Sequence, residues 1–399
     1  ITDISWLNLF RFLPGLIFAL LAFQAYAFGR ERGFGLGAAF LVTLIPTTIR
    51  FLGPAFLVPV SLGLIFIPLT LFILHRLMSD IRGPALLLAT LFTLLFVHPP
   101  TMAIISAIIV VYLIFFLFSK EKAKNIGRYS ALMFTLIASM YVFMLLWAPA
   151  SLDFVATEAA SPELHLPLPP IQDAVPKYGL IPAALFVLGV SVLLYRHKGE
   201  DLAIVTSAFG LLAFQQLYPR FYIGPDIIYE RGWLYLYVMM ALLGAAALPA
   251  IWGWVKSGLK NWPHLAGGAA YTAIGILIAA SFILSLQNHL SEPYYHVVDD
   301  EMYQEFLWIR EYVPPRYQIG VLDTHQAWPF AAITGKFAYT AEVAPRFHAK
   351  GRSAMEFLQD GARDTSWLRE RGISIVYSHE TVDNGQLIKV NQDLYLLVE

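Results

Sequence analysis

The sequence predicts an all-α polytopic membrane bundle of about ten spans, followed by a small extracytoplasmic α/β domain. Three observations favour this class. Hydrophobic residues make up 58% of the chain and charged residues only 14%, whereas a soluble domain carries about 25% charged residues. Long apolar runs alternate with short basic turns as far as residue 289. From residue 290 the composition becomes mixed, so we divide the chain into a transmembrane domain, 1–289, and an α/β domain, 290–399.

The apolar runs set the expected spans, since roughly 20 apolar residues cross about 30 Å of hydrocarbon. The candidates are 5–28, 34–49, 57–75, 83–97, 101–118, 129–148, 179–195, 202–218, 232–255 and 265–288. Run 83–97 is short and meets the next run at His98-Pro99-Pro100, while prolines interrupt 34–75. Irregular backbone at membrane depth survives only where it lines protein or water. These breaks therefore predict an outward-facing polar cavity.

The basic loop from Lys120 to Arg128 predicts the orientation, because loops rich in Lys and Arg stay on the cytoplasmic side. Counting crossings from this loop places twelve basic residues of the turns inside and four outside. The inside set is Arg30, Arg32, Arg76, Arg82, Lys120, Lys122, Lys124, Arg128, Arg196, Lys198, Lys256 and Lys260. The chain is thus expected to be a multi-pass protein of the cell membrane, with its C-terminal domain outside.

The C-terminal domain shows alternating helix and strand patterns. A helix from Asp300 to Tyr312 would place Met302, Phe306 and Ile309 on one face. Strand-like runs at 318–322, 337–340, 373–378 and 394–398 alternate with helical patterns near 326–333, 353–360 and 364–371. This alternation predicts a small α/β domain.

Candidate binding residues lie at the expected outer surface. His98 either ends a helix or forms the floor of the cavity, because ionisable groups at membrane depth are often functional. Arg231 and Arg220, with Asp226 and Glu230, form either an interfacial salt-bridge network or an anion site, since a guanidinium matches phosphate geometry. Gly232 would leave room for a ligand to approach Arg231.

Aromatic residues crowd the same region. They are Tyr218, Tyr222, Tyr229, Trp233, Tyr235 and Tyr237. An aromatic belt at the membrane interface is favoured; the alternative is a platform for a sugar, and Tyr222 is the candidate ligand contact.

The chain carries few candidates for catalysis. Asp153 and Asp173, in the expected outer loop 149–178, are carboxylates that could act as a base or simply be solvated. Asp323 and His325 follow a predicted strand and carry no metal-ligand spacing. The absence of cysteine excludes disulfide and thiol chemistry. No Walker loop, dinucleotide fingerprint or HExxH motif occurs, and nothing indicates nucleic acid as a partner.

Several segments resemble the GT-C superfamily of membrane glycosyltransferases. They are Leu9-Phe10-Arg11-Phe12-Leu13-Pro14, Phe96-Val97-His98-Pro99-Pro100-Thr101, Glu230-Arg231-Gly232-Trp233-Leu234 and Ala332-Ile333-Thr334-Gly335-Lys336. The resemblance implies sugar transfer from a polyprenyl-phosphate-linked donor on the outer face, within membrane lipid. A carboxylate base would activate the acceptor and cations would hold the leaving phosphate. The resemblance also allows a divalent metal cofactor, to which no residue of this sequence is assigned.

Two departures bear on the resemblance. Members of that superfamily carry their main carboxylate in the first outer loop, and run 5–28 resembles their third span. We therefore expect that carboxylate to lie upstream of Ile1. The chain alone should then have no transfer activity. A partner chain is one source of the missing spans. The Trp-Trp-Asp-Tyr-Gly signature is absent, so asparagine glycosylation is not predicted. The alternative is a non-catalytic membrane protein, either a lipid or glycan transporter or a scaffold subunit.

Overall fold

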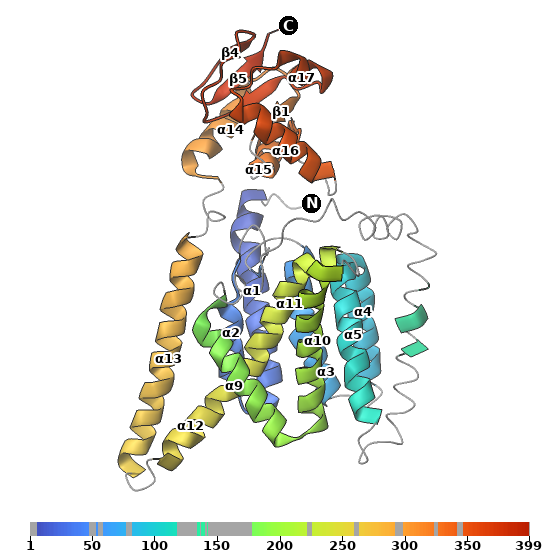
Figure 1. The fold of residues 1–399 in the computed structure, drawn as a ribbon, viewed down its shortest axis with the longest axis vertical. Coiled ribbons are helices and arrows are strands. Elements are labelled where there is room, and N and C mark those ends of the chain that lie inside the picture. Colours follow the sequence, from blue (N-terminus) through green and yellow to red (C-terminus); the bar gives the residue numbers. More distant parts are fainter. Residues whose placement is uncertain are drawn as a thin grey trace. The chain divides into compact units, whose positions relative to one another are not determined.

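The computed structural model divides the chain into two compact units, Ile1–Ser291 and Glu292–Glu399. The first unit is helical and the second contains a small sheet (Figure 1). The residues described are 6–47, 53–54, 59–76, 82–117, 134–135, 137–139, 142, 178–221, 226–258, 263–291, 298–322, 326–340 and 346–398.

The helices of the first unit follow the apolar runs of the sequence. They are α1 Trp6–Glu31, α2 Gly35–Thr43, α3 Pro59–Arg76, α4 Arg82–Val97, α5 Pro99–Leu117, α9 Leu180–Arg196, α10 Gly199–Phe221, α11 Asp226–Gly244, α12 Ala247–Gly258 and α13 Pro263–Ser291. Run 232–255 is divided between α11 and α12 by a turn at Ala245 and Ala246. Run 129–148 lies largely outside the described residues.

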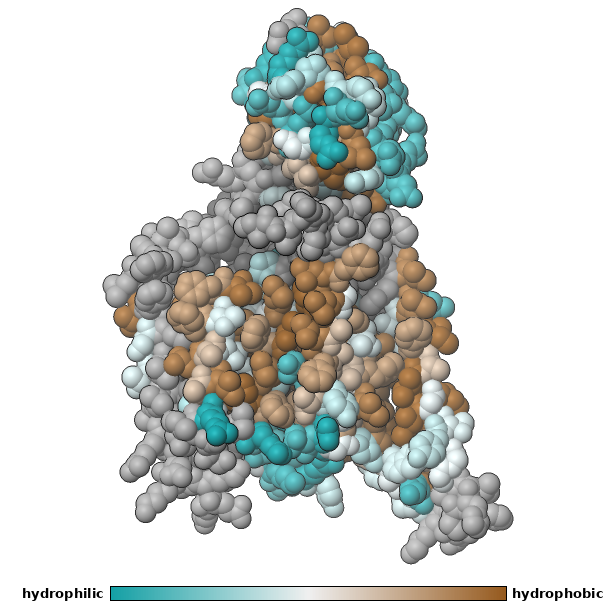
Figure 2. Space-filling view, turned by 180° about the vertical axis from the view of Figure 1, so that it is seen from behind, coloured by the Kyte–Doolittle hydropathy of each residue, from teal (hydrophilic) through white to brown (hydrophobic). Residues whose placement is uncertain are grey.

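The first unit is that of a membrane protein. Among the described residues, four helical stretches are long and apolar enough to cross a bilayer: Phe12–Glu31, Pro59–Arg76, Arg231–Gly258 and Gly267–Gln287. Helices α4, α5 and α9 are shorter but apolar. Figure 2 shows a hydrophobic band across the middle of the helices. Helix α2 has only 9 residues, about 14 Å of rise, so run 34–49 does not cross as one helix.

Helix α11 lies at the centre of the unit. It packs against α2, α3, α9 and α10, and its residues from Gly232 to Gly244 are buried. Tyr218, Tyr229, Trp233, Tyr235 and Tyr237 are therefore at most 3% exposed. An interfacial belt requires contact with headgroups, so that prediction is wrong for these five residues. Tyr222 lies outside the described residues.

Three of the turns that the charge count places on one side meet at one end of the bundle. Arg32, after α1, pairs with Asp201 at the start of α10 and lies 3.9 Å from Glu200. His75, at the end of α3, lies 2.5 Å from the same Glu200 carboxylate. The side chains of Arg32 and Asp201 are almost completely buried, and burying a charge is costly unless it is paired. The ion pairs therefore tie α1, α3 and α10 together.

The second unit is a five-stranded sheet with helices on both faces. Its elements are α14 Asp300–Tyr312, β1 Ile319–Val321, α15 Ala327–Thr334, β2 Phe337–Ala338, α16 Arg346–Gln359, α17 Thr365–Glu370, β3 Ile375–Tyr377, β4 Leu387–Lys389 and β5 Leu394–Leu397. The strand order is β2-β1-β3-β5-β4. The first three strands are parallel, and β5 pairs antiparallel with β3 and β4.

The pattern of this unit was largely predictable. Met302, Phe306 and Ile309 are the buried residues of α14, which confirms the predicted helix face. Four strands match the predicted runs, whereas β4 was missed because only Leu387 of its three residues is buried. Helices α14 and α15 pack with Phe306 and Phe330 on one face, and α16 and α17 cover the other.

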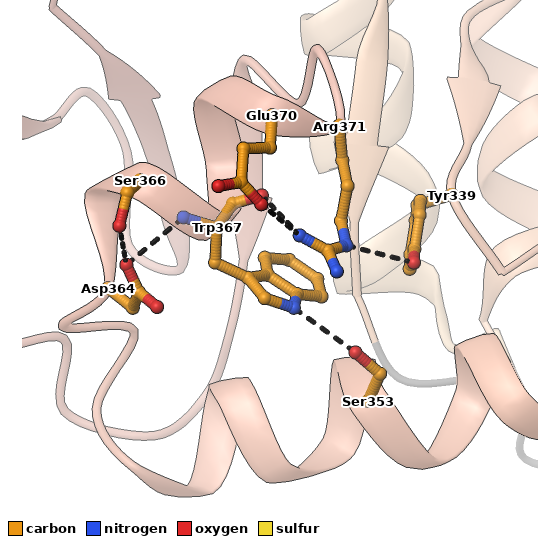
Figure 3. A network of polar contacts seen from close by, with 7 residues as sticks. All are labelled: Tyr339, Ser353, Asp364, Ser366, Trp367, Glu370 and Arg371. Atoms are coloured by element: carbon orange, nitrogen blue, oxygen red, sulfur yellow. Dashed lines mark hydrogen bonds and ion pairs between the residues drawn. The ribbon is translucent and has the colours of Figure 1, made fainter.

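A tryptophan joins α16 to α17 (Figure 3). The rings of Trp367 and Phe357 are stacked with their centroids 4.4 Å apart, and Trp367 Nε1 donates to the Ser353 hydroxyl at 3.1 Å. The Arg371 guanidinium lies 4.7 Å from the ring centroid and donates to the Tyr339 hydroxyl (Figure 3). These side chains therefore pack α16 and α17 together on the second face of the sheet.

Candidate functional site

His98 is the junction of two helices. Its backbone N–H donates to Leu94 of α4 at 2.8 Å, and its carbonyl accepts from Met102 of α5 at 3.2 Å. Pro99 and Pro100 occupy the first two positions of α5 and have no N–H to satisfy. The first unsatisfied donor is then the Thr101 N–H, which donates to His98 Nδ1 at 3.2 Å. His98 therefore caps α5 with its side chain.

Thr101 links this cap to the central helix. Its Oγ1 lies 2.7 Å from His98 Nδ1 and 2.8 Å from the Tyr235 hydroxyl of α11. The Tyr235 hydroxyl is itself 3.5 Å from His98 Nδ1. Thr101 and Tyr235 are completely buried. The three side chains form one polar cluster, which we call the His98 cluster.

Glycine on α3 makes room for this cluster. A Cβ at Gly63 would lie 3.0 Å from Thr101 Cβ and equally close to its Cγ2, and closer still to its Oγ1. Real Cβ atoms almost never approach other atoms that closely, so only glycine allows Thr101 to lie against the α3 backbone here. Gly63 thereby fixes the position from which Thr101 reaches both partners.

Arg231 belongs to the same site. It precedes Tyr235 by four residues on α11, so the two side chains share a helix face. Tyr235 in turn meets His98, because its hydroxyl lies 3.5 Å from His98 Nδ1. Arg231 is half-buried at the start of the apolar stretch Arg231–Gly258. The fold therefore places Arg231 within one helical turn of a residue that contacts His98, although the two predicted binding residues are far apart in the sequence. A guanidinium can bind an anion through charge-assisted hydrogen bonds.

Gly232 has a different role from the one predicted. The amide of Gln215, from α10, occupies the space beside it, and a Cβ at residue 232 would overlap Gln215 Nε2. That Nε2 donates to the Tyr229 carbonyl at 3.2 Å. The prediction that Gly232 admits a ligand is wrong, because a neighbouring side chain fills the room.

Of the remaining charged candidates, the structure describes the side chain of Arg220. Arg220 is exposed near the end of α10. Asp153, Asp173, Tyr222, Asp323 and His325 lie outside the described residues, as do the side chains of Asp226 and Glu230. The described residues contain no group of three or more His, Cys, Asp or Glu placed to hold a metal ion.

Sequence reasoning missed the two partners of His98. Thr101 carried a usable signal, because a residue three positions after a helix cap is the one whose N–H a capping side chain meets. Tyr235 is 134 residues from Thr101, and the sequence placed it only in an aromatic belt or a platform for a sugar. No pattern in the sequence links it to His98.

Comparison with known proteins identifies the fold. No family model matches the chain, and no curated protein matches it. The solved structure of the Archaeoglobus fulgidus oligosaccharyltransferase, in complex with zinc and sulfate, is similar with a TM-score of 0.56 at 15% identity. The match covers 92% of this chain and 56% of that protein. The chain therefore shares its fold with that oligosaccharyltransferase and spans little more than half the length of that neighbour.

Proposed function

We propose that this protein is a membrane glycosyltransferase that uses a sugar linked to polyprenyl phosphate, with the donor phosphate bound by Arg231 and His98. The observation that carries the proposal is the contact between α11 and the α4–α5 junction: the Tyr235 hydroxyl lies 3.5 Å from His98 Nδ1, and Arg231 stands one helical turn before Tyr235 on the same face. The GT-C-like fold supports the same class of reaction.

The depth of the site fits a lipid-linked phosphate. A polyprenyl donor keeps its tail in the bilayer, so its phosphate must lie near the headgroups. Arg231 begins an apolar stretch that runs to Gly258, which puts its guanidinium at an end of a span. Arginine stays charged there and can bind phosphate through two parallel hydrogen bonds.

The charges of the turns support one side of the membrane for this site. Gly63 lies near the start of α3 and His75 at its end, so the His98 cluster and the Arg32 ion pairs occupy opposite ends of the bundle. The twelve-to-four distribution of basic residues favours the Arg32 end as cytoplasmic. The donor site, and by the same count the C-terminal unit, would then lie outside.

Sugar transfer also needs reacting groups beside the donor phosphate. Transfer needs a carboxylate base for the acceptor, and Asp153 and Asp173 are the first candidates to replace in this chain. Arg220 and Tyr222 stay candidates for contacts with the donor. The described residues hold no three-ligand group, so we assign no residue to a metal.

Donor binding by Arg231 variants tests the proposal. The probe is a farnesyl-phosphoryl sugar, titrated into the full chain in lipid nanodiscs. Removing a charge-assisted hydrogen bond costs roughly 1.5–3 kcal/mol, so Arg231→Ala should weaken binding about tenfold or more. Arg231→Lys should weaken it less, because lysine keeps the charge but loses the paired geometry.

Glu230→Gln is the matched control, since it changes a charge at the adjacent position and should leave affinity nearly unchanged. If both Arg231 variants bind the probe like the parent while their thermal midpoints are unaltered, the donor site is wrongly assigned.

A further inference from the structure

The hydrogen bonds of the His98 cluster determine which nitrogen of the imidazole carries the proton. The Thr101 N–H can only donate, so His98 Nδ1 must present a lone pair to it. A proton on Nδ1 would face that N–H directly. The ring is therefore neutral, with its hydrogen on Nε2.

The hydroxyl groups are consistent with this tautomer. With Nδ1 as an acceptor, the Thr101 hydroxyl donates to it at 2.7 Å. The Tyr235 hydroxyl can then donate to Thr101 Oγ1 at 2.8 Å. Each hydrogen has one acceptor, and the chain of donors runs from Tyr235 through Thr101 to Nδ1. Among the described residues, every hydrogen bond of the ring engages Nδ1, which leaves the Nε2–H for a ligand.

We infer that the two nitrogens of His98 have separate tasks: Nδ1 caps α5, and the Nε2–H donates a hydrogen bond to the donor phosphate beside Arg231. Thr101 and Tyr235 are positioning residues that hold this tautomer and the ring orientation. The inference rests on the proposed function, because the ligand it names is the phosphate of that donor.

The start of α5 explains why the ring is needed. A helix N-terminus usually offers backbone N–H groups to an anion. Here Pro99 and Pro100 have none, and the Thr101 N–H is already used by His98. The donor that this helix end can present is thus the imidazole itself. A neutral ring also avoids placing a second cation beside Arg231, so Arg231 supplies the charge and His98 a directed hydrogen bond.

Replacing His98 with two different amides separates the tasks. The Asn oxygen can occupy the place of Nδ1 and cap the helix, since Asn is a favoured cap, but its side chain does not reach the position of Nε2. The Gln amide reaches that position but is not a favoured cap. His98→Asn should keep a thermal midpoint near that of the parent and bind the farnesyl-phosphoryl sugar about tenfold more weakly. His98→Gln should melt earlier and bind more tightly than His98→Asn.

The positioning residues are tested through the tautomer. In the full chain labelled with ¹⁵N-histidine, the His98 signals, assigned by their loss in His98→Asn, should show a protonated Nε2 and an unprotonated Nδ1. Thr101→Val and Tyr235→Phe should shift these signals toward a mixture of tautomers and weaken probe binding several-fold. Neither change should alter the signals of His75 or His197.

The outcomes separate this inference from the proposed function. If Arg231→Ala loses the probe while His98→Asn binds it like the parent, donor binding by Arg231 stands, but His98 only caps the helix and this inference fails. A protonated Nδ1 in the parent overturns the assignment of tautomer regardless of any binding result. If neither His98→Asn nor Arg231→Ala changes the affinity for the probe, both this inference and the proposed function are wrong.

Discussion

Single residues in this chain are explained by the backbone groups that they satisfy. Lys336, part of the tail segment that resembled a family motif, donates through Nζ to the carbonyls of Val313, Pro314 and Tyr317. It therefore closes the turn between α14 and β1, and burial lowers its pKa. His98 satisfies a backbone donor in the same way, yet keeps a second nitrogen for a ligand. A cap and a binding group need not be alternatives when the side chain has two polar atoms.

Asp364 gives a prediction of pH dependence at this scale. Its carboxylate accepts from the Ser366 hydroxyl at 2.5 Å and from the Trp367 N–H at 3.0 Å, which caps α17 (Figure 3). The hydrogen bond from Ser366, followed by that from Trp367, holds the pKa of Asp364 below its usual value of 3.8. A carboxyl group whose pKa is lower in the folded state than in the unfolded state stabilises the fold at a pH above its unfolded-state pKa. That stabilisation is lost as the pH falls through the folded-state pKa.

Hydrogen exchange of the full chain checks this expectation. Amides of α17 should exchange faster below about pH 4 than at pH 6 after correction for intrinsic rates. Asp364→Asn keeps an acceptor without a titrating charge, so its protection should no longer depend on pH in this window. A parent whose α17 protection is the same at pH 3 and pH 6 would contradict the assignment.

At the scale of elements, close packing of helices decides where polar groups meet. Helix α11 is surrounded by α2, α3, α9 and α10, which converts an expected aromatic belt into buried contacts such as the stack of Tyr218 on Tyr229 at 4.5 Å. The α3–α5 contact depends on Gly63. The opposite end depends on the ion pairs of Arg32.

Gly63→Ala tests the α3–α5 contact. Ala is normally better than Gly inside a helix by up to about 1 kcal/mol, but here its methyl group would press on Thr101. The variant should melt earlier than the parent and show a disturbed His98 tautomer. Gly210→Ala in α10 is the control, since nothing lies within 4 Å of the added methyl group, and it should be neutral or stabilising. If Gly63→Ala and Gly210→Ala melted at the same temperature, the contact of residue 63 with Thr101 would not limit the size of the side chain there.

Asp201→Asn tests the buried ion pairs. The Asp201 side chain is 1% exposed and that of Arg32 is 6% exposed. Removing one partner of a buried pair typically costs 3–5 kcal/mol, and we expect about 3 kcal/mol because Glu200 stays near Arg32. Reversible unfolding in detergent measures it.

Two controls accompany this variant. Glu31→Gln breaks the more exposed pair with Arg76 and should cost no more than about 1 kcal/mol. The double variant Arg32→Leu with Asp201→Leu removes both charges and should be more stable than Asp201→Asn. A double variant that is no more stable would show that the charges themselves are not the cause.

At the scale of the whole molecule, the two units follow different physical rules. The first unit has apolar surfaces and carries its charges at the ends of its helices, as Figure 2 shows by the hydrophilic residues gathered at its lower end. The second has a sheet with a buried cluster on each face. That contrast is what a bilayer and an aqueous phase respectively demand.

Membrane orientation is a prediction for the whole chain. The chain has no cysteine, so single cysteines at Asn125 and Gln359 can be labelled individually in intact cells. Gln359 is exposed at the end of α16. An impermeant maleimide should label the Gln359→Cys variant and leave Asn125→Cys unlabelled until the cells are opened. Equal labelling of both in intact cells would end the orientation argument and remove the reason for an outer-face donor site.

The sequence by itself determined the helical membrane unit, the change of composition near residue 290, the face of α14 and four of the five strands. Those features follow from local periodicity and hydrophobicity, which neighbouring residues express. It also pointed to His98 and Arg231 one at a time. Only the tertiary structure decided that His98 contacts Tyr235, one helical turn after Arg231, that Gln215 fills the space at Gly232 and that the aromatic residues of α11 are buried. These depend on which helices pack together, and helices that are apolar on every side carry no pattern that specifies their neighbours.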